Sequence, residues 1–382
     1  MQNRSLRRPT RPVLASAAVA GLVLTLGPLS TPAVSAHPTT APRTVASGLD
    51  NPRHLSFAPD GTLYVAESGR GGAGPCQEGP EGGTVCLGAS GAVTAVKHGR
   101  QHRVLTGLPS LAAADGSQAS GPSDVSMTGN RAITVAVGLG GSPQTRAAFG
   151  PGGARLGTLL TGRLAPKPHL EVLADVVGYE ARHNPDGGED SNTSGLVKVG
   201  NAYAVTDAGG NDLVRLGKRG TGSTLAVFPD TMTEAPPFLG LPPGTQIPMQ
   251  AVPTGVAVGP DGAYYVSQLN GFPFTPGKST IWRVVPGQAP TAYATGLTNV
   301  TDLTWSGDSL YAVQLADDGL LSVPEGQLPK GSLLKVGRGS AHSTVAGELV
   351  APYGVAVRGG TAYVTTCAVC AGAGSVVAIV LR

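Results

Sequence analysis

The chain has 382 residues, of which only 13% are charged and 4% aromatic, and its formal charge is +3. Four arginines near the N-terminus supply this excess, and without them the charge is about −1, so the composition argues against a basic surface for nucleic acid. Low charge together with 57 glycines is typical of many short strands joined by tight turns.

The first 36 residues are predicted to be a signal peptide. Arginines at positions 4–11 precede an apolar stretch at 13–29, and Val34-Ser35-Ala36 fits a cleavage site. The alternative is a membrane anchor, because about 17 apolar residues are at the short end of a membrane span. The cleavage-like tripeptide and the prolines after it favour export. We therefore expect a secreted chain of residues 37–382 without a further membrane span.

One short pattern recurs six times after this segment. It consists of an apolar strand, a tight turn and a second apolar strand, at 54–67, 124–137, 195–207, 255–268, 302–314 and 354–366. In the first and fourth copies the turn is Pro-Asp-Gly, in which proline fixes one φ and glycine accepts a positive one. A unit that repeats in this way indicates a repeat architecture.

A third strand, and usually a fourth, follows each copy, which is the pattern of a β-propeller blade. The sixth copy ends after three strands. Thr44–Ser47 is similar to the outer strands of other copies, so we expect it to pair with the strand near 375–381 and close the ring. The sequence therefore predicts an all-β fold, in which residues 37–382 form a single six-bladed β-propeller with four antiparallel strands per blade.

The loops that follow the second strands and join the blades are long, and in such blades both kinds emerge at the same end. One face is thus expected to carry 69–90, 138–157, 178–193, 208–211, 229–252, 269–278 and 315–330. Long loops on a rigid scaffold commonly carry function. We predict that a small ligand or an extracellular partner binds at this long-loop face, over the central channel, and we expect a monomer.

Polar residues at the start of each first strand and the end of each second strand are expected to gather at this channel mouth. His54, Glu67 and Asp124 are candidate acid–base residues, and Glu67, Asp207 and Asp302 are candidate ligands of Ca²⁺ or another divalent cation. The alternative is that such side chains line a wet channel and bond to one another. The remaining mouth residues are Arg53, Gln268, Gln314, Tyr353 and Thr366.

The densest acidic segment is the loop 184–192. Asp186, Glu189, Asp190 and Asn192 offer oxygen donors for calcium, although their spacing does not match an EF-hand loop. The alternative interpretation is a turn cluster of Asp, Asn and Gly residues.

Four cysteines form two local pairs, Cys76 with Cys86 and Cys367 with Cys370. In an exported chain an even number suggests disulfides, and we predict these two bridges among the possible pairings. A redox pair at Cys367 and Cys370 would need a helix N-terminus to activate a thiolate, and zinc binding by all four cysteines is disfavoured by the long first spacing.

The segment from Asp50 to Gly69 resembles the first blade of the ScyD/ScyE family, which comprises exported bacterial proteins named after a scytonemin gene cluster. The Gly74–Cys86 loop, the Asp190-Ser-Asn192 step and the Pro253–Val256 strand are similar too. The resemblance implies a propeller of NHL or SMP-30 type and carries over no catalytic residue.

The related SMP-30/gluconolactonase enzymes hold a divalent metal at the channel mouth on Glu, Asn and Asp, which implies a metal-dependent hydrolase or lactonase as the alternative function. This chain departs from them, because Asn51-Pro-Arg-His54 stands where the first-blade Glu is expected.

Overall fold

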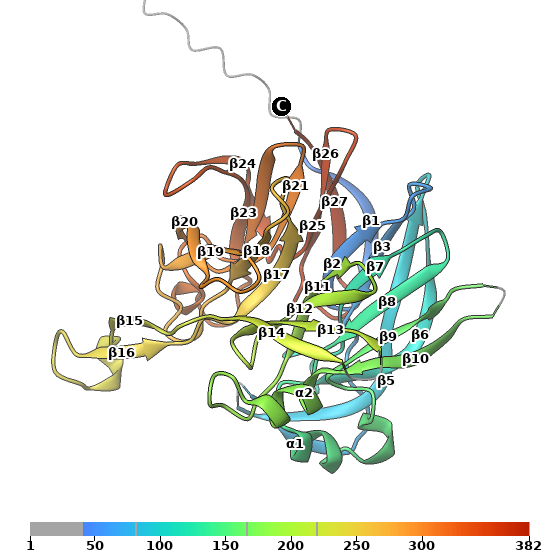
Figure 1. The fold of residues 1–382 in the computed structure, drawn as a ribbon, viewed down its shortest axis with the longest axis horizontal. Coiled ribbons are helices and arrows are strands. Elements are labelled where there is room, and N and C mark those ends of the chain that lie inside the picture. Colours follow the sequence, from blue (N-terminus) through green and yellow to red (C-terminus); the bar gives the residue numbers. More distant parts are fainter. Residues whose placement is uncertain (1–40, 81, 166, 219–220, 382) are drawn as a thin grey trace, which may run out of the picture. The chain divides into compact units, whose positions relative to one another are not determined.

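Six antiparallel sheets surround a central channel (Figure 1), which confirms the predicted all-β, six-bladed propeller. The computed structural model describes residues 41–381 apart from positions 81, 166 and 219–220. The predicted signal peptide lies outside the described residues.

In blades one to five the strands follow the chain order from the inner to the outer strand, and in blade six β1 supplies the outer strand. Blade one contains β2 (Pro52–Phe57), β3 (Leu63–Glu67), β5 (Thr84–Lys97) and β6 (Arg100–Ala112), with a short β4 (Cys76–Glu78) added to β5; blade two contains β7 (Pro122–Met127), β8 (Ala132–Val137), β9 (Thr158–Arg163) and β10 (His169–Asp175). Blade three contains β11 (Thr193–Val199), β12 (Ala202–Asp207), β13 (Asp212–Leu216) and β14 (Gly222–Val227); blade four contains β17 (Pro253–Val258), β18 (Tyr264–Gln268), β19 (Ser279–Val284) and β20 (Thr291–Leu297). Blade five contains β21 (Val300–Ser306), β22 (Ser309–Gln314), β23 (Lys330–Val336) and β24 (His342–Val350); blade six contains β25 (Val355–Arg358), β26 (Thr361–Thr366), β27 (Gly374–Val380) and β1 (Arg43–Leu49).

Blade six joins the two ends of the propeller. β1 pairs antiparallel with β27, with Thr44 opposite Val377 and Ser47 opposite Ser375. This is the predicted closure. It places the outer strand of blade six on the edge of β27 and so removes an exposed strand edge.

The second strands are almost entirely buried, since each lies between two neighbouring strands and its blade packs against other blades. All residues of β3, β12 and β18 are buried. A strand covered on both faces lacks the usual apolar–polar alternation, which explains why these segments read as continuous apolar runs.

The long loops contain structure that the sequence pattern did not reveal. The loops predicted at 138–157 and 178–193 include α1 (Pro143–Ala148), η1 (Gly150–Gly153) and most of α2 (Val176–His183). α2 begins where the Asp175 carboxylate accepts a hydrogen bond from Gly178 N. β15 (Thr231–Glu234) and β16 (Gln246–Met249) form a separate hairpin, and η3 (Pro237–Leu239) and η4 (Leu320–Ser322) are single turns.

Both predicted disulfides are present, Cys76–Cys86 and Cys367–Cys370. The first bridge joins β4 to β5, and the second closes a tight turn after β26. Among the described residues, no helix combines the length and apolarity needed to cross a membrane.

Candidate functional site

A β-bulge interrupts the first strand of blades one to five close to its start. In blade one the register with β3 shifts between Pro52 and Leu55, and in blade two the register with β8 shifts between Pro122 and Asp124. The corresponding shifts in blades three, four and five lie at 193–196, 253–256 and 300–302. A bulge adds one residue and reorients side chains beside it. In blades one and two, adjacent residues consequently line the channel at two different levels, Arg53 with His54 and Ser123 with Asp124.

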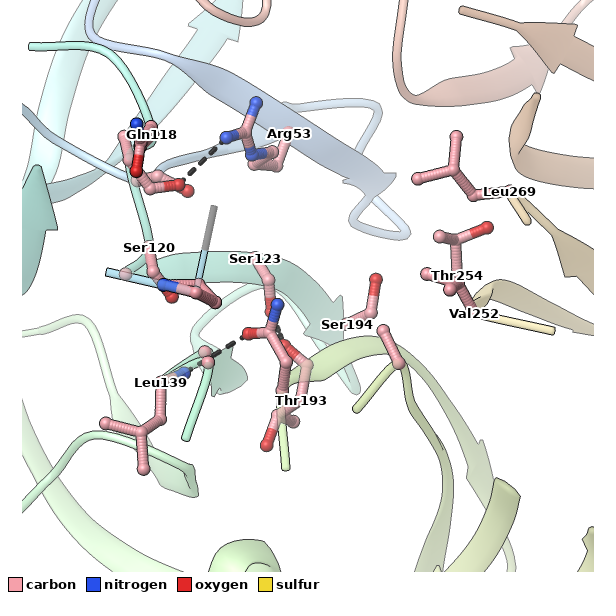
Figure 2. Close-up of a pocket in the computed structure, with 18 of the residues that line it drawn as sticks. Arg53, Gln118, Ser120, Ser123, Leu139, Thr193, Ser194, Val252, Thr254 and Leu269 are labelled. Carbon is pink, nitrogen blue, oxygen red and sulfur yellow. Dashed lines mark hydrogen bonds between the residues drawn. The ribbon is translucent and has the colours of Figure 1, made fainter. Parts of the chain in front are cut away.

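The upper level is a cavity of about 440 Å³ at the long-loop face (Figure 2). Its lining comes from all six blades, and several residues belong to the long loops predicted to meet there. It consists of Arg53, Ser68, Pro80, Val85, Leu111, Gln118, Ala119, Ser120, Gly121, Ser123, Gly138, Leu139, Gly140, Asn192, Thr193, Ser194, Ala208, Val252, Thr254, Leu269, Phe274, Leu315, Leu320, Tyr353 and Val369.

Neutral hydroxyl and amide groups supply most of the polar character of this cavity. Ser123 Oγ donates to the Thr193 carbonyl oxygen over 2.8 Å, and Asn192 Oδ1 accepts from Leu139 N over 3.2 Å, so these walls are cross-linked. The Ser194 hydroxyl points into the open space (Figure 2). The remaining lining is largely aliphatic, as in many small-molecule sites.

Arg53 contributes the positive charge of the lining. Its guanidinium donates to the carbonyl oxygens of Ala119 and Ala368 and lies 4.9 Å from the centre of the Tyr353 ring. These contacts hold the charge at the cavity wall. The described lining contains no Asp, Glu, His, Lys or Cys residue, so it offers donors and acceptors rather than an acid–base pair.

The lower level is a narrow layer of three polar side chains and three glycines. His54, Asp124 and Asp302 are buried here, and the matching positions of the other blades are Gly195, Gly255 and Gly354. A methyl group on Gly255 would lie 2.6 Å from Asp302 Oδ1, and one on Gly354 would lie 2.8 Å from the His54 α carbon. Space at this level therefore admits side chains from only some of the blades.

Charge complementarity holds this layer together. His54 Nδ1 lies 3.7 Å from Asp124 Oδ2, and His54 Nε2 lies 3.2 Å from the Thr301 carbonyl oxygen. Asp124 and Asp302 also accept backbone hydrogen bonds from the next blade, from Leu196 N and Val355 N. The layer thus links several blades across the channel.

Opposing effects set the pKa of His54. Burial lowers it, but the carboxylates of Asp302 and Asp124 raise the pKa of His54 to about 10. Burial also raises the pKa of Asp302 to about 6, although His54 opposes that rise. At neutral pH His54 is consequently a charged imidazolium, which cannot accept a proton as a general base.

Glu67, predicted as a catalytic and metal-binding residue, lies away from the cavity inside blade one. It accepts hydrogen bonds from Asp50 N, Thr94 Oγ1 and the Arg103 guanidinium, at distances of 2.5–3.1 Å. Arg103 also bonds to Asp50 Oδ2 over 2.9 Å. Glu67 therefore anchors the segment between β1 and β2 to the rest of blade one.

The structure does not bring the predicted metal ligands Glu67, Asp207 and Asp302 together. Asp207 accepts hydrogen bonds at the end of β12 from Ser191 Oγ and from the backbone of residues 192, 209 and 210, while Asp302 lies in the channel layer. The reason is that a second strand lies one strand away from the channel. Gln268, Gln314 and Thr366, also at the ends of second strands, bond to neighbouring side chains instead of lining the cavity.

Sequence reasoning overlooked the hydroxyl residues of the cavity, above all Ser123, Ser194 and Thr254. The signal that identifies them is positional: each comes directly before the first residue of a repeat copy, as do Arg53 and Tyr353. Without knowledge of the bulges, this position is indistinguishable from an outward-facing one.

No family model and no curated protein matches the chain. Solved structures do match. One is a Thermus thermophilus protein assigned as an oxidoreductase (glucose dehydrogenase), with 17% identity, a TM-score of 0.50, and coverage of 89% of this chain and 99% of that one. A second is a Bacteroides thetaiotaomicron protein of unknown function, with 9% identity, a TM-score of 0.51, and coverage of 90% of this chain and 74% of that one. These likenesses show the β-propeller fold alone, so the ScyD/ScyE resemblance stays a prediction.

Proposed function

We propose that this protein is an exported β-propeller that binds a small polar organic molecule, neutral or carrying one negative charge, in the cavity at its long-loop face. The observation that carries this proposal is the lining itself, with many neutral hydroxyl and amide groups, one arginine and no acidic side chain among the described residues. Arg53 places positive charge at the cavity wall, and among the described lining residues a cation finds no carboxylate partner.

Size and construction support the same conclusion. A volume of about 440 Å³ lies within the range of small-molecule sites, roughly 300–1,000 Å³. The wall groups are held by hydrogen bonds between blades, as for Ser123 of β7 with Thr193 of β11. A preorganised wall lowers the entropic cost of ligand binding.

The test is a binding survey of the purified chain by thermal shift and isothermal titration. The probes are monosaccharides, aldonic acids, their lactones and hydroxybenzoates. We expect at least one neutral or anionic probe to bind and cationic amino sugars of similar size not to bind. Ser194→Phe fills the cavity at a residue whose hydroxyl faces the open space, so it should weaken that binding by about tenfold or more.

Ser343→Phe is the matched control, because it adds the same side chain at an exposed position on the outer strand of blade five. It should leave binding unchanged. Binding that survives Ser194→Phe, or a survey in which only cations bind, would contradict the proposal. The lactone probes also test the alternative function, since a metal-dependent lactonase would hydrolyse them and lose that activity in EDTA.

A further inference from the structure

A second polar site lies in blade three, outside the cavity lining. Glu180 extends from α2, Asp207 ends β12 and Asp212 begins β13. One carboxylate oxygen of each residue lies within 4.8 Å of the others. All three residues are buried, with exposed fractions of 1%, 1% and 0%.

The three carboxylates differ in how they are bonded. Asp207 is saturated by the hydroxyl and backbone donors described above. By contrast, neither oxygen of Glu180 and neither oxygen of Asp212 has a hydrogen-bond partner among the described residues. Buried polar groups are nearly always paired, and an unpaired buried charge is strongly unfavourable. Four unpaired oxygens at one place therefore indicate that a proton or a cation completes the site.

The local sequence is arranged to bring these carboxylates together. The turn Ala208–Asn211 pairs Asp207 directly opposite Asp212 at the end of the β12–β13 ladder. A methyl group on Gly210 would lie 2.9 Å from the Glu180 carboxylate carbon and from its Oε2 atom. Glycine at this position is thus what allows α2 to approach the turn.

The electrostatic surroundings leave these carboxylates in need of a positive partner. Burial raises the pKa of Glu180 to about 8, with Asp207, Asp186 and Asp190 as further causes of the rise. Burial is also the main reason that the pKa of Asp212 is raised. The charges of Asp207, Glu180 and Asp186 raise it further. Two partners relieve such repulsion, a bound proton or a bound metal ion.

We propose that Glu180, Asp207 and Asp212 form a calcium site. The donors are oxygen atoms only, which suits a hard cation and disfavours zinc, since zinc prefers nitrogen and sulfur ligands. Calcium accepts six to eight oxygens in irregular geometry, whereas magnesium requires a near-ideal octahedron. Asp186 contributes to the raised pKa of both unpaired carboxylates, but its own oxygens accept hydrogen bonds from Gly188 N and Asn211 Nδ2.

The position of the site gives the ion a consequence for the cavity. Asp207 bonds to Ser191 Oγ and to Asn192 N, and Asn192 and Thr193 line the cavity. An ion at this site would hold the segment 191–193 against blade three. The site is separate from the cavity, so failure of the calcium test leaves ligand binding to be judged by its own survey.

The experiment uses the purified chain after EDTA treatment and dialysis, with CaCl₂ alone as the probe. Isothermal titration should show one calcium ion per chain, and calcium should raise the melting temperature more than MgCl₂ or NaCl at equal ionic strength. Asp212→Asn should weaken calcium binding by about 100-fold and abolish the shift in melting temperature. In EDTA, the same variant should melt at or above the wild-type temperature, because it removes a buried carboxyl group that has no hydrogen-bond partner among the described residues.

Glu180→Gln provides a second variant of similar shape, with the same expected loss. Asp115→Asn, at an exposed turn, is the control that keeps calcium binding. Absence of calcium binding to the wild-type chain at millimolar concentration would overturn the proposal. So would unchanged binding in both site variants, or loss of calcium binding in Asp302→Asn with full binding in Asp212→Asn.

Discussion

His54 shows how a single residue position can serve the fold instead of the chemistry that its type suggests. Its imidazolium lies 3.7 Å from Asp124 Oδ2, the charge of Asp302 raises its pKa, and its ring centre is 5.1 Å from that of Tyr353. The layer is crowded, because a side chain at the matching glycine positions of the other three blades would clash with neighbouring atoms. We therefore interpret His54 as the charged centre of a layer that fastens the inner strands to one another.

The pH dependence of stability tests this interpretation. A histidine whose pKa is raised by folding stabilises the native state fully below its unfolded value of 6.5, and this contribution is lost as pH rises through about 10. His54→Gln should therefore cost more free energy of unfolding near pH 6 than near pH 10, by about 1 kcal/mol or more. Urea denaturation of both proteins at the two pH values measures this difference. An equal cost at both pH values would show that the charge of His54 does not matter.

At the scale of elements, the first strands and their bulges decide which side chains line the channel mouth. The strand pattern and the closure by residues 44–47 could be predicted from sequence because apolar runs and turn residues repeat. The cavity lining could not, since a bulge such as that between Pro52 and Leu55 depends on hydrogen bonds to the neighbouring strand. For the same reason, the sequence predicts Arg53, His54 and Glu67 together at the channel mouth, whereas Arg53 and His54 lie at two levels and Glu67 lies inside blade one.

The Glu67 network gives an element-scale prediction. Arg103 on β6 reaches across to Glu67 on β3 and to Asp50 before β2. Arg103→Met leaves the fully buried Glu67 without its cation, so it should lower the free energy of unfolding by about 2 kcal/mol, discounted for the partial exposure of Arg103. Chemical denaturation provides the measurement.

The matched control is Lys330→Met, because Lys330 forms an ion pair with Glu348 at the surface. Surface pairs of this kind contribute little, so the denaturation midpoint should hardly change. A similar small effect of Arg103→Met would mean that Glu67 is stabilised by its other donors alone.

The whole propeller depends on its last strand being supplied by the beginning of the described chain. β1 is the outer strand of blade six, and Ala46 and Leu49 are buried in its core together with residues of blade one. Closure therefore joins blade six to blade one through both hydrogen bonds and apolar contacts.

A chain beginning at residue 51 tests the role of β1. It should unfold several kcal/mol more easily than the chain beginning at residue 37, because the edge of β27 and the apolar contacts of β1 become exposed. A synthetic peptide of residues 41–50 added in excess should restore part of the melting temperature. Equal stability of the two chains would show that β1 is dispensable.

We propose that ligands bind in the cavity above the His54 layer. The most direct measurement is a crystal structure with the tightest-binding compound from the probe survey. We predict density for the compound in the cavity, in contact with Ser194 and at least one of Ser123 and Thr254. A compound bound below the His54 layer, or against the β15–β16 hairpin, with an unoccupied cavity, would contradict the claim.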